Sequence, residues 1–108
     1  MASAPLGVFE EQVLLAIVRA GDEAYGMQVR REIERVTGRT VAIGAVYATL
    51  ARLESKGLVV SRRGDEGGMS RRLFRLSPAG ARELAETRVL RDRMWRGIDL
   101  DALHPRKS

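Results

Sequence analysis

The hydrophobic positions between residues 40 and 56 predict an amphipathic helix around which the rest of the chain is organised. Its apolar residues recur at the spacing of one helical stripe: Ile43, Val46, Leu50 and Leu53. The opposite face is small and cationic at one end, and carries Gly44, Ala45, Ala48, Arg52 and Ser55. Such a helix can approach a partner closely, and the DNA major groove, roughly 12 Å wide, accepts one helix. Taken alone, the pattern favours an ordinary surface helix, because Ala and Arg are strong helix formers.

The segment that follows changes this interpretation. Gly57 is expected to end the helix, and residues 58–63 form a β-branched run typical of a strand. Residues 64–70 are a glycine-rich loop, and residues 71–76 alternate basic with apolar side chains. A helix, a strand, a loop and a strand in this order are typical of a winged helix, in which the loop is the wing.

The chain before residue 40 supplies two further helices. After a flexible leader at residues 1–7, helical spacing predicts a first helix from Val8 to just before Gly21. A second pattern ends at Gly38, where a left-handed cap is suitable, and its inward residues are Met27, Val29, Ile33 and Val36. The second and third helices then form a helix-turn-helix whose second member is the recognition helix.

Ser77 and Pro78 predict the start of a final helix, since serine caps free N–H groups and proline suits the first helical position. This helix is expected over residues 77–98, with a frayed tail at residues 99–108. It has no core of its own left to bury against, so it is expected to pack against its copy in a homodimer. The predicted dimer-interface residues are Leu84, Leu90, Met94, Trp95 and Ile98. The expected fold class is mainly α with a small β-wing (α+β), with a winged helix-turn-helix domain at residues 8–76.

Composition and charge narrow the class of protein. The 108 residues suit one domain, contain no cysteine for a disulfide, and include no apolar run near the roughly 18 residues of a membrane span. No signal peptide is recognisable at the start, so a cytoplasmic protein without a membrane partner is expected. The net charge is +5, and residues 39–75 contain eight Arg or Lys against three Asp or Glu. The positive charge is thus concentrated in the predicted recognition helix and wing, where phosphate contacts would form.

An enzyme is not expected. The single histidine, His104, lies in the predicted tail, and no Ser/His/Asp grouping or metal-ligand spacing is present. Residues 64–68 are rich in glycine but join two strands, whereas a phosphate-binding glycine loop joins a strand to a helix. Neither a metal nor a cofactor is therefore expected.

Several motifs together resemble the PadR family of transcriptional regulators, of the small type with a single C-terminal dimerisation helix. They cover roughly residues 8 to 81. The matching strings are Phe9-Glu10-x-x-Val13-Leu14-Leu15, Ala24-Tyr25-Gly26-Met27, Gly44-Ala45-Val46-Tyr47-Ala48-Thr49-Leu50-x-Arg52-Leu53-Glu54-x-Lys56-Gly57-Leu58 and Arg72-Leu73-Phe74-Arg75-Leu76-Ser77-x-x-Gly80.

The resemblance implies a homodimeric repressor that grips a pseudo-palindromic operator in double-stranded DNA until an effector releases it. Tyr47 matches the tyrosine of the family's recognition helix, whose hydroxyl would contact a phosphate. Ala45 and Ala48 would face the bases, where small apolar groups meet a thymine methyl. The basic residues of the helix end and wing stems would contact the DNA backbone or the minor groove. The complete set expected to bind DNA is Thr40, Gly44, Ala45, Tyr47, Ala48, Arg52, Lys56, Arg71 and Arg72.

Trp95 has two interpretations. In some small members of the family, aromatic residues of the last helix line a pore at the dimer interface that stacks planar aromatic small molecules. Trp95 would play that part, with Met94 adapting around the ligand. The alternative, which we favour, is that Trp95 is an anchor of the dimer interface, where aromatic residues are enriched.

A second function from another class remains open. A winged helix also serves as a protein-interaction or assembly module, in which the basic face would bind an acidic partner. Salt distinguishes the two, because DNA binding through about six to ten phosphates loses on the order of a thousandfold or more in affinity between 50 and 200 mM salt.

Overall fold

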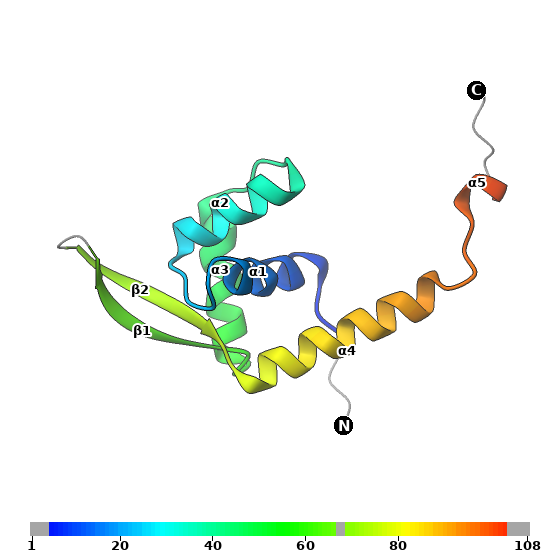
Figure 1. The fold of residues 1–108 in the computed structure, drawn as a ribbon. Coiled ribbons are helices and arrows are strands. Elements are labelled where there is room, and N and C mark those ends of the chain that lie inside the picture. The colour runs from blue at the N-terminus through cyan, green and yellow to red at the C-terminus, as the bar shows by residue number, and fades with distance from the viewer. Residues whose placement is uncertain (1–4, 67–68, 104–108) are drawn as a thin grey trace.

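The computed structural model describes residues 5–66 and 69–103, which fold into a helical body, a β-wing and a projecting helix (Figure 1). The wing and the outer half of the projecting helix lie at opposite ends of the molecule. The radius of gyration, 16.4 Å, exceeds the roughly 13 Å typical of a compact chain of this length. In chain order the elements are α1 (Val8–Arg19), α2 (Gly26–Thr37), α3 (Ile43–Ser55), β1 (Val59–Glu66), β2 (Met69–Leu76), α4 (Pro78–Trp95) and α5 (Leu100–Leu103).

The hydrophobic core lies where α1, α2 and α3 meet, and the base of the sheet closes it. Its largest fully buried side chains are Val13, Leu14, Ile17, Val29, Val46, Leu50, Leu53 and Val59. The predicted apolar stripe of α3 is thus confirmed, with Ile43 partly buried at its start. Val36, predicted to face inward, is instead 50% exposed, because it lines an open groove between α1 and α2.

The recognition helix lies within the predicted stretch of residues 40–56. It begins at Ile43, after a turn, because the preceding Ala42 has extended backbone angles (φ −72°, ψ 132°). The Val41 N–H donates to the Glu34 carboxylate at 2.7 Å, which fixes this extended turn to α2. Gly38 (φ +71°) lies just after α2 in the left-handed region, as predicted for its cap.

The wing strands are longer than predicted. Antiparallel pairing runs from Val59 opposite Leu76 to Glu66 opposite Met69, so the strands include most of residues 64–70, predicted as a loop. Gly64 pairs with Arg71 in this ladder, and its lack of a side chain leaves room for Leu73, whose Cδ1 would lie 2.3 Å from an added Cβ. The expected wing tip, residues 67–68, lies outside the described residues.

The first half of α4 packs against its own chain, which the sequence did not predict. The helix begins as expected, with the Ser77 hydroxyl accepting from the Gly80 N–H at 3.0 Å. Leu84 packs against the core, and the buried Thr87 accepts a hydrogen bond from the Leu6 N–H at 3.1 Å. The expectation that this helix has no core of its own to bury against is therefore wrong for its first half.

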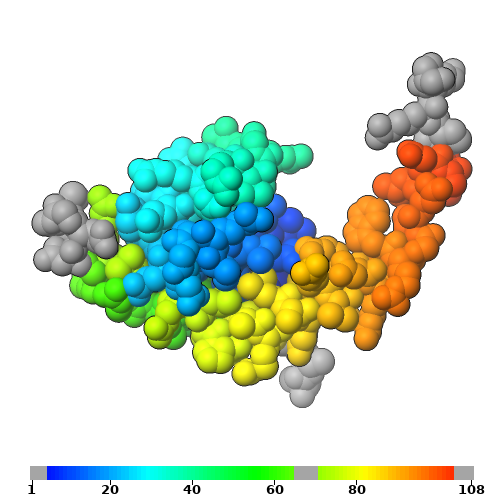
Figure 2. Space-filling view, in the orientation of Figure 1, coloured from blue at the N-terminus to red at the C-terminus, as the bar shows by residue number. Residues whose placement is uncertain are grey.

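The last turn of α4 and the segment after it project away from the body, as Figure 2 shows. The helix ends at Trp95 rather than at residue 98, and α5 forms a helical turn within the predicted tail. The Asp99 carboxylate caps α5 by accepting from the Asp101 and Ala102 N–H groups. Large apolar side chains are exposed along the arm formed by the second half of α4 and this segment: Val89, Leu90, Met94, Trp95, Ile98, Leu100 and Leu103. Among the described residues, no helix has both the length and the apolar character needed to cross a membrane.

Candidate nucleic-acid interface

The solvent-facing side of α3 is built from small residues. The predicted members Gly44, Ala45, Ala48 and Ser55 are all exposed, and so is Ala51. Sequence reasoning overlooked Ala51, although it lies three positions after Ala48 and seven after Gly44, on the same helical face. Because none of these side chains is long, the α3 backbone is open to close approach by a partner.

A hollow of about 290 Å³ opens on one flank of α3, between the start of α2 and strand β2. It is lined by Tyr25, Met27, Arg31, Tyr47, Arg71 and Arg72. The structure thus brings three of the predicted DNA-binding residues together, and adds Tyr25, Met27 and Arg31 from α2 and the residue before it. Tyr25 and Met27 belong to the helix-opening string of residues 24–27, but nothing in the sequence placed that string, or Arg31, beside the wing. Outside residues 65–70 of the wing, whose side chains lie outside the description, no acidic residue lines the hollow.

Tyr47 forms one wall of this hollow, and Gly26 determines where its ring can lie. A Cβ at Gly26 would come within 2.5 Å of two ring carbons of Tyr47 and 2.8 Å of its hydroxyl oxygen. Glycine at the start of α2 therefore lets the ring rest against the helix backbone. The side chain remains 47% exposed, so it is open to a partner on this flank of α3.

The two wing arginines differ in what holds them. The Arg71 guanidinium lies over the Tyr25 ring, 4.4 Å from its centroid, in a cation–π contact. Arg72 lies 5.7 Å from the Phe74 centroid and also donates to the Glu54 carboxylate at 3.0 Å. Arg72 is thus partly neutralised, whereas the contact that holds Arg71 leaves its charge uncompensated.

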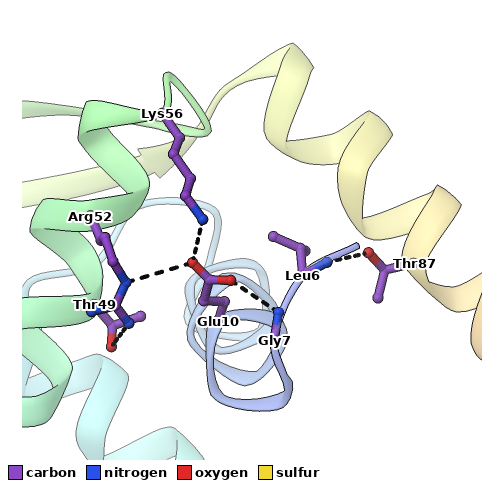
Figure 3. A network of polar contacts seen from close by, with 7 residues as sticks. All are labelled: Leu6, Gly7, Glu10, Thr49, Arg52, Lys56 and Thr87. Atoms are coloured by element: carbon purple, nitrogen blue, oxygen red, sulfur yellow. Dashed lines mark hydrogen bonds and ion pairs between the residues drawn. The ribbon is translucent and has the colours of Figure 1, made fainter. Parts of the chain in front are cut away.

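The opposite flank of α3 is tied to α1 by one carboxylate, Glu10 (Figure 3). The Lys56 ammonium lies 2.9 Å from Glu10 Oε2, and Arg52 Nε lies 3.8 Å from the same oxygen. Glu10 Oε1 accepts from the Gly7 N–H at 3.0 Å, which caps the start of α1. The Gly7 N–H and then Lys56 hold the pKa of the Glu10 carboxyl below its ordinary value, although its partial burial opposes the shift.

Two predicted DNA-binding cations, Arg52 and Lys56, are therefore placed beside an acid. Their side chains remain 56% and 51% exposed, while that of Glu10 is only 12% exposed. Arg52 also donates to the buried Thr49 hydroxyl at 3.3 Å. The remaining predicted contact, Thr40, is exposed but lies in the turn before α3 rather than on the helix.

The five predicted dimer-interface residues lie in two different environments. Leu84 packs against the core of its own chain. The other four are at least 43% exposed on the projecting arm: Leu90, Met94, Trp95 and Ile98. Arg91, which interrupts the apolar positions, turns back and pairs with the buried Glu11 of α1.

The body contains α1, α2 and α3, of which α2 and α3 form a helix-turn-helix with α3 exposed, and the two-stranded wing follows them. This arrangement defines a winged helix-turn-helix protein. A family model, the transcriptional regulator PadR-like family, matches residues 14–86. The chain belongs to this family, so it is a transcriptional regulator and not an enzyme.

Known relatives agree with this assignment. The chain is 37% identical over 79 residues to transcriptional regulator Rv3488 of Mycobacterium tuberculosis, which covers 73% of each protein. A PadR family regulator from Eggerthella lenta has a similar fold, with a TM-score of 0.70 at 24% identity over 92% of this chain and 90% of that one. Bacillus subtilis PadR, solved in complex with operator DNA, gives a TM-score of 0.66 at 21% identity over 78% of this chain and 48% of that one. These two structures show the fold that the chain shares with them.

Proposed function

We propose that this regulator is a homodimeric, sequence-specific DNA-binding repressor that a small-molecule effector releases from its operator. The observation that carries the proposal is the exposed small-residue face of α3 beside a hollow whose described lining contains three arginines and no acid. A polyanion that enters against α3 would meet both features at once. The complex of Bacillus subtilis PadR with operator DNA supports the same use of this fold.

The exposed face of α3 would enter the major groove of double-stranded DNA. Gly44 allows the backbone to approach, and the methyl groups of Ala45 and Ala48 would contact thymine methyls. The Tyr47 hydroxyl would donate to a phosphate at the groove edge, and Thr40 would lie near the groove entry before α3. Direct base contacts by small side chains give specificity, while the surrounding cations supply most of the affinity.

The projecting arm supports homodimerisation. Its exposed apolar side chains, including Trp95 at 56% and Met94 at 79%, form a surface that a monomer would leave in water. Burial of the arm against a second copy would place two winged helices on one pseudo-palindromic operator. Within this proposal, the regulator acts in the cytoplasm.

The effector part of the proposal rests on Trp95. Its large, exposed aromatic ring would stack a planar aromatic small molecule at the dimer interface, and the flexible Met94 would adapt around it. A ligand that changes how two arms pack would change the separation of the two α3 helices. The operator affinity would then fall.

Fluorescence anisotropy of a labelled duplex from the upstream region of the protein's own gene tests DNA binding. We expect binding that survives excess unrelated DNA, with one dimer per site and an affinity that falls steeply as salt rises. Binding that unrelated DNA removes would contradict sequence specificity. If the protein bound an acidic protein partner but no duplex at low salt, the basic face would instead belong to a protein-interaction module.

Substitution of Trp95 by alanine tests the dimer. Truncation of an aromatic anchor is expected to weaken self-association by about tenfold or more, because such anchors carry much of an interface's binding free energy. Sedimentation velocity across a concentration series measures this change. Arg82→Ala, an exposed change on the part of α4 near the body, is the control and should leave the dimer intact. An unchanged dimer in Trp95→Ala would place the interface elsewhere.

A further inference from the structure

We infer that the hollow beside α3 is a cradle for one DNA phosphodiester, in which Arg31 is a ligand and Tyr25 positions Arg71. Neither Tyr25 nor Arg31 was among the residues expected to bind DNA. The inference rests on the proposed function and assigns the binding of a phosphate to residues at the start of α2 and on β2. The phosphate would sit between the start of α2, the Tyr47 side of α3 and strand β2.

The charge of the hollow is the first argument for an anion. Arg31, Arg71 and Arg72 line it from two elements, and among the side chains that the structure describes no acid lines it. Within the described part of the chain, neither Arg31 nor Arg71 forms an ion pair with a carboxylate. Two cations that face the same concave space without a counter-charge repel one another, and an anion between them removes that repulsion.

The stacking of Arg71 on Tyr25 is the second argument. An arginine loses side-chain entropy when it is fixed on a ligand, and a contact that orders it beforehand reduces that loss. The ring lies 4.4 Å from the guanidinium carbon and orders the side chain without neutralising it. All the guanidinium N–H groups that do not face the ring remain available for the oxygens of a phosphate.

The position of the hollow determines which anion fits. It adjoins the exposed small-residue face of α3, so a partner that covers α3 also covers the hollow. In DNA the phosphates border the major groove. When the recognition helix lies in the groove, a residue on its flank would therefore reach a phosphate. The Tyr47 hydroxyl, also at the hollow, adds a neutral donor to the cations.

Anisotropy titrations on the same duplex across a salt series test the cradle with matched variants. Arg31→Gln and Arg71→Gln should each weaken binding about tenfold or more, as expected for a lost hydrogen bond to a charged group. The double variant Arg31→Gln/Arg71→Gln should reduce the slope of log affinity against log salt by about one per protomer, because the one phosphate that the two arginines share contributes roughly 0.9. Arg82→Gln removes the same charge as either single variant, but from α4, which does not line the hollow, and should have a much smaller effect.

Tyr25→Leu and Tyr25→Phe test the positioning role. The leucine variant should lose most of the affinity that Arg71→Gln loses, whereas the phenylalanine variant keeps the ring and should bind like the wild type. The double variant Tyr25→Leu/Arg71→Gln should be no weaker than Arg71→Gln alone, because Tyr25 acts through Arg71. Circular dichroism melts confirm that each variant is folded. Arg71→Gln changes a residue on a strand surface, so it still tests the contact of Arg71 with the phosphate if Tyr25→Leu does not fold.

The outcomes separate the two proposals. Absence of duplex binding by the wild-type protein would overturn the proposed function. Wild-type binding that Arg31→Gln and Tyr25→Leu leave unchanged would overturn the cradle alone. Equal losses in Tyr25→Leu and Tyr25→Phe would show that the hydroxyl acts rather than the ring, and would overturn the positioning role. Binding of polyglutamate that depends on Arg31 and Arg71, with duplex binding independent of them, would replace the phosphodiester by a protein partner.

Discussion

The two flanks of α3 carry similar numbers of cations and differ in what holds them. On the flank that faces α1, Arg52 and Lys56 share the largely buried carboxylate of Glu10. On the other flank, Arg71 stacks on a neutral ring, and the hollow that it lines shows no acid among its described residues. A count of basic residues therefore measures only the total charge, whereas the pairing of each basic residue with an acid decides how much of that charge a partner meets.

The flank at Glu10 belongs to the internal structure of the body. Glu10 also caps α1 through Gly7, and the preceding Leu6 N–H donates to Thr87 of α4 (Figure 3). The first turn of α1 thus contacts both the end of the recognition helix and the start of the projecting arm. Its ion pairs contribute to the packing of the helices, whereas Arg31 and Arg71 of the hollow remain available to a ligand.

Neutralising two cations on each flank of α3 should give the largest difference in operator affinity. The double variant Arg31→Gln/Arg71→Gln should lose about a hundredfold in operator affinity, since each lost charge-assisted hydrogen bond costs about tenfold or more. The double variant Arg52→Gln/Lys56→Gln should lose less than about tenfold, because Glu10 already offsets these charges. Anisotropy at one fixed salt concentration measures both.

The two double variants are controls for one another. Each removes two positive charges, so the long-range attraction to DNA falls by a similar amount in both. Any further difference reports local contacts. Equal losses would show that pairing with Glu10 does not reduce the contribution of Arg52 and Lys56, and the distinction between the flanks would be wrong.

Sequence periodicity predicted the architecture well because it reports local physics. The stripe at Val46, Leu50 and Leu53 is buried as predicted, and Ser77 caps α4 as predicted. These features depend on residues three or four positions apart, which helical geometry alone brings together. The element order then followed from the succession of helix, strand and strand signals.

The distribution of charge at the site was not predictable in the same way. Glu10 and Lys56 are 46 positions apart, and Tyr25 and Arg71 are brought together only by the packing of α2 on β2. The first half of α4 was misjudged for the same reason, since Leu6 and Thr87 are 81 positions apart. Contacts of this kind depend on how whole elements pack, and a single sequence carries no periodic signal for them.

Glu10→Gln should change operator affinity by less than the double variants do, and should raise it rather than lower it. Glutamine keeps an oxygen that accepts from the Gly7 N–H, but its neutral side chain releases the charges of Arg52 and Lys56. We expect operator affinity to rise by a few-fold at low salt, with a steeper salt dependence. Glu32→Gln on α2 is the matched control, because it adds the same net charge without freeing a cation of α3. An affinity gain of equal size in both variants would indicate a general charge effect only.

The same variant has a predicted pH signature. The pKa of Glu10 is lower in the folded protein than its ordinary value of 4.5, so ionised Glu10 stabilises the fold above that pH. This stabilisation is lost as the pH falls through the lower folded pKa. Thermal melts should therefore show wild type more stable than Glu10→Gln at pH 7, with a difference that shrinks below about pH 4.5. A difference that does not change with pH would exclude this carboxylate as the cause.

Thr87→Val should have the smallest effect on DNA binding. Valine has nearly the same shape but cannot accept the Leu6 N–H, so the unfolding free energy should fall by about 1 kcal/mol. That corresponds to a melting temperature lower by roughly 4–8 °C for a domain of this size. Operator affinity should stay within about twofold of wild type, because the contact supports α1 and α4 and no cation of the hollow depends on it. Thr87→Ser restores the acceptor and should recover most of the stability. A loss of operator affinity in Thr87→Val that serine reverses would show that the first turn of α1 controls DNA binding through Glu10, and the structural role assigned to that flank would be wrong.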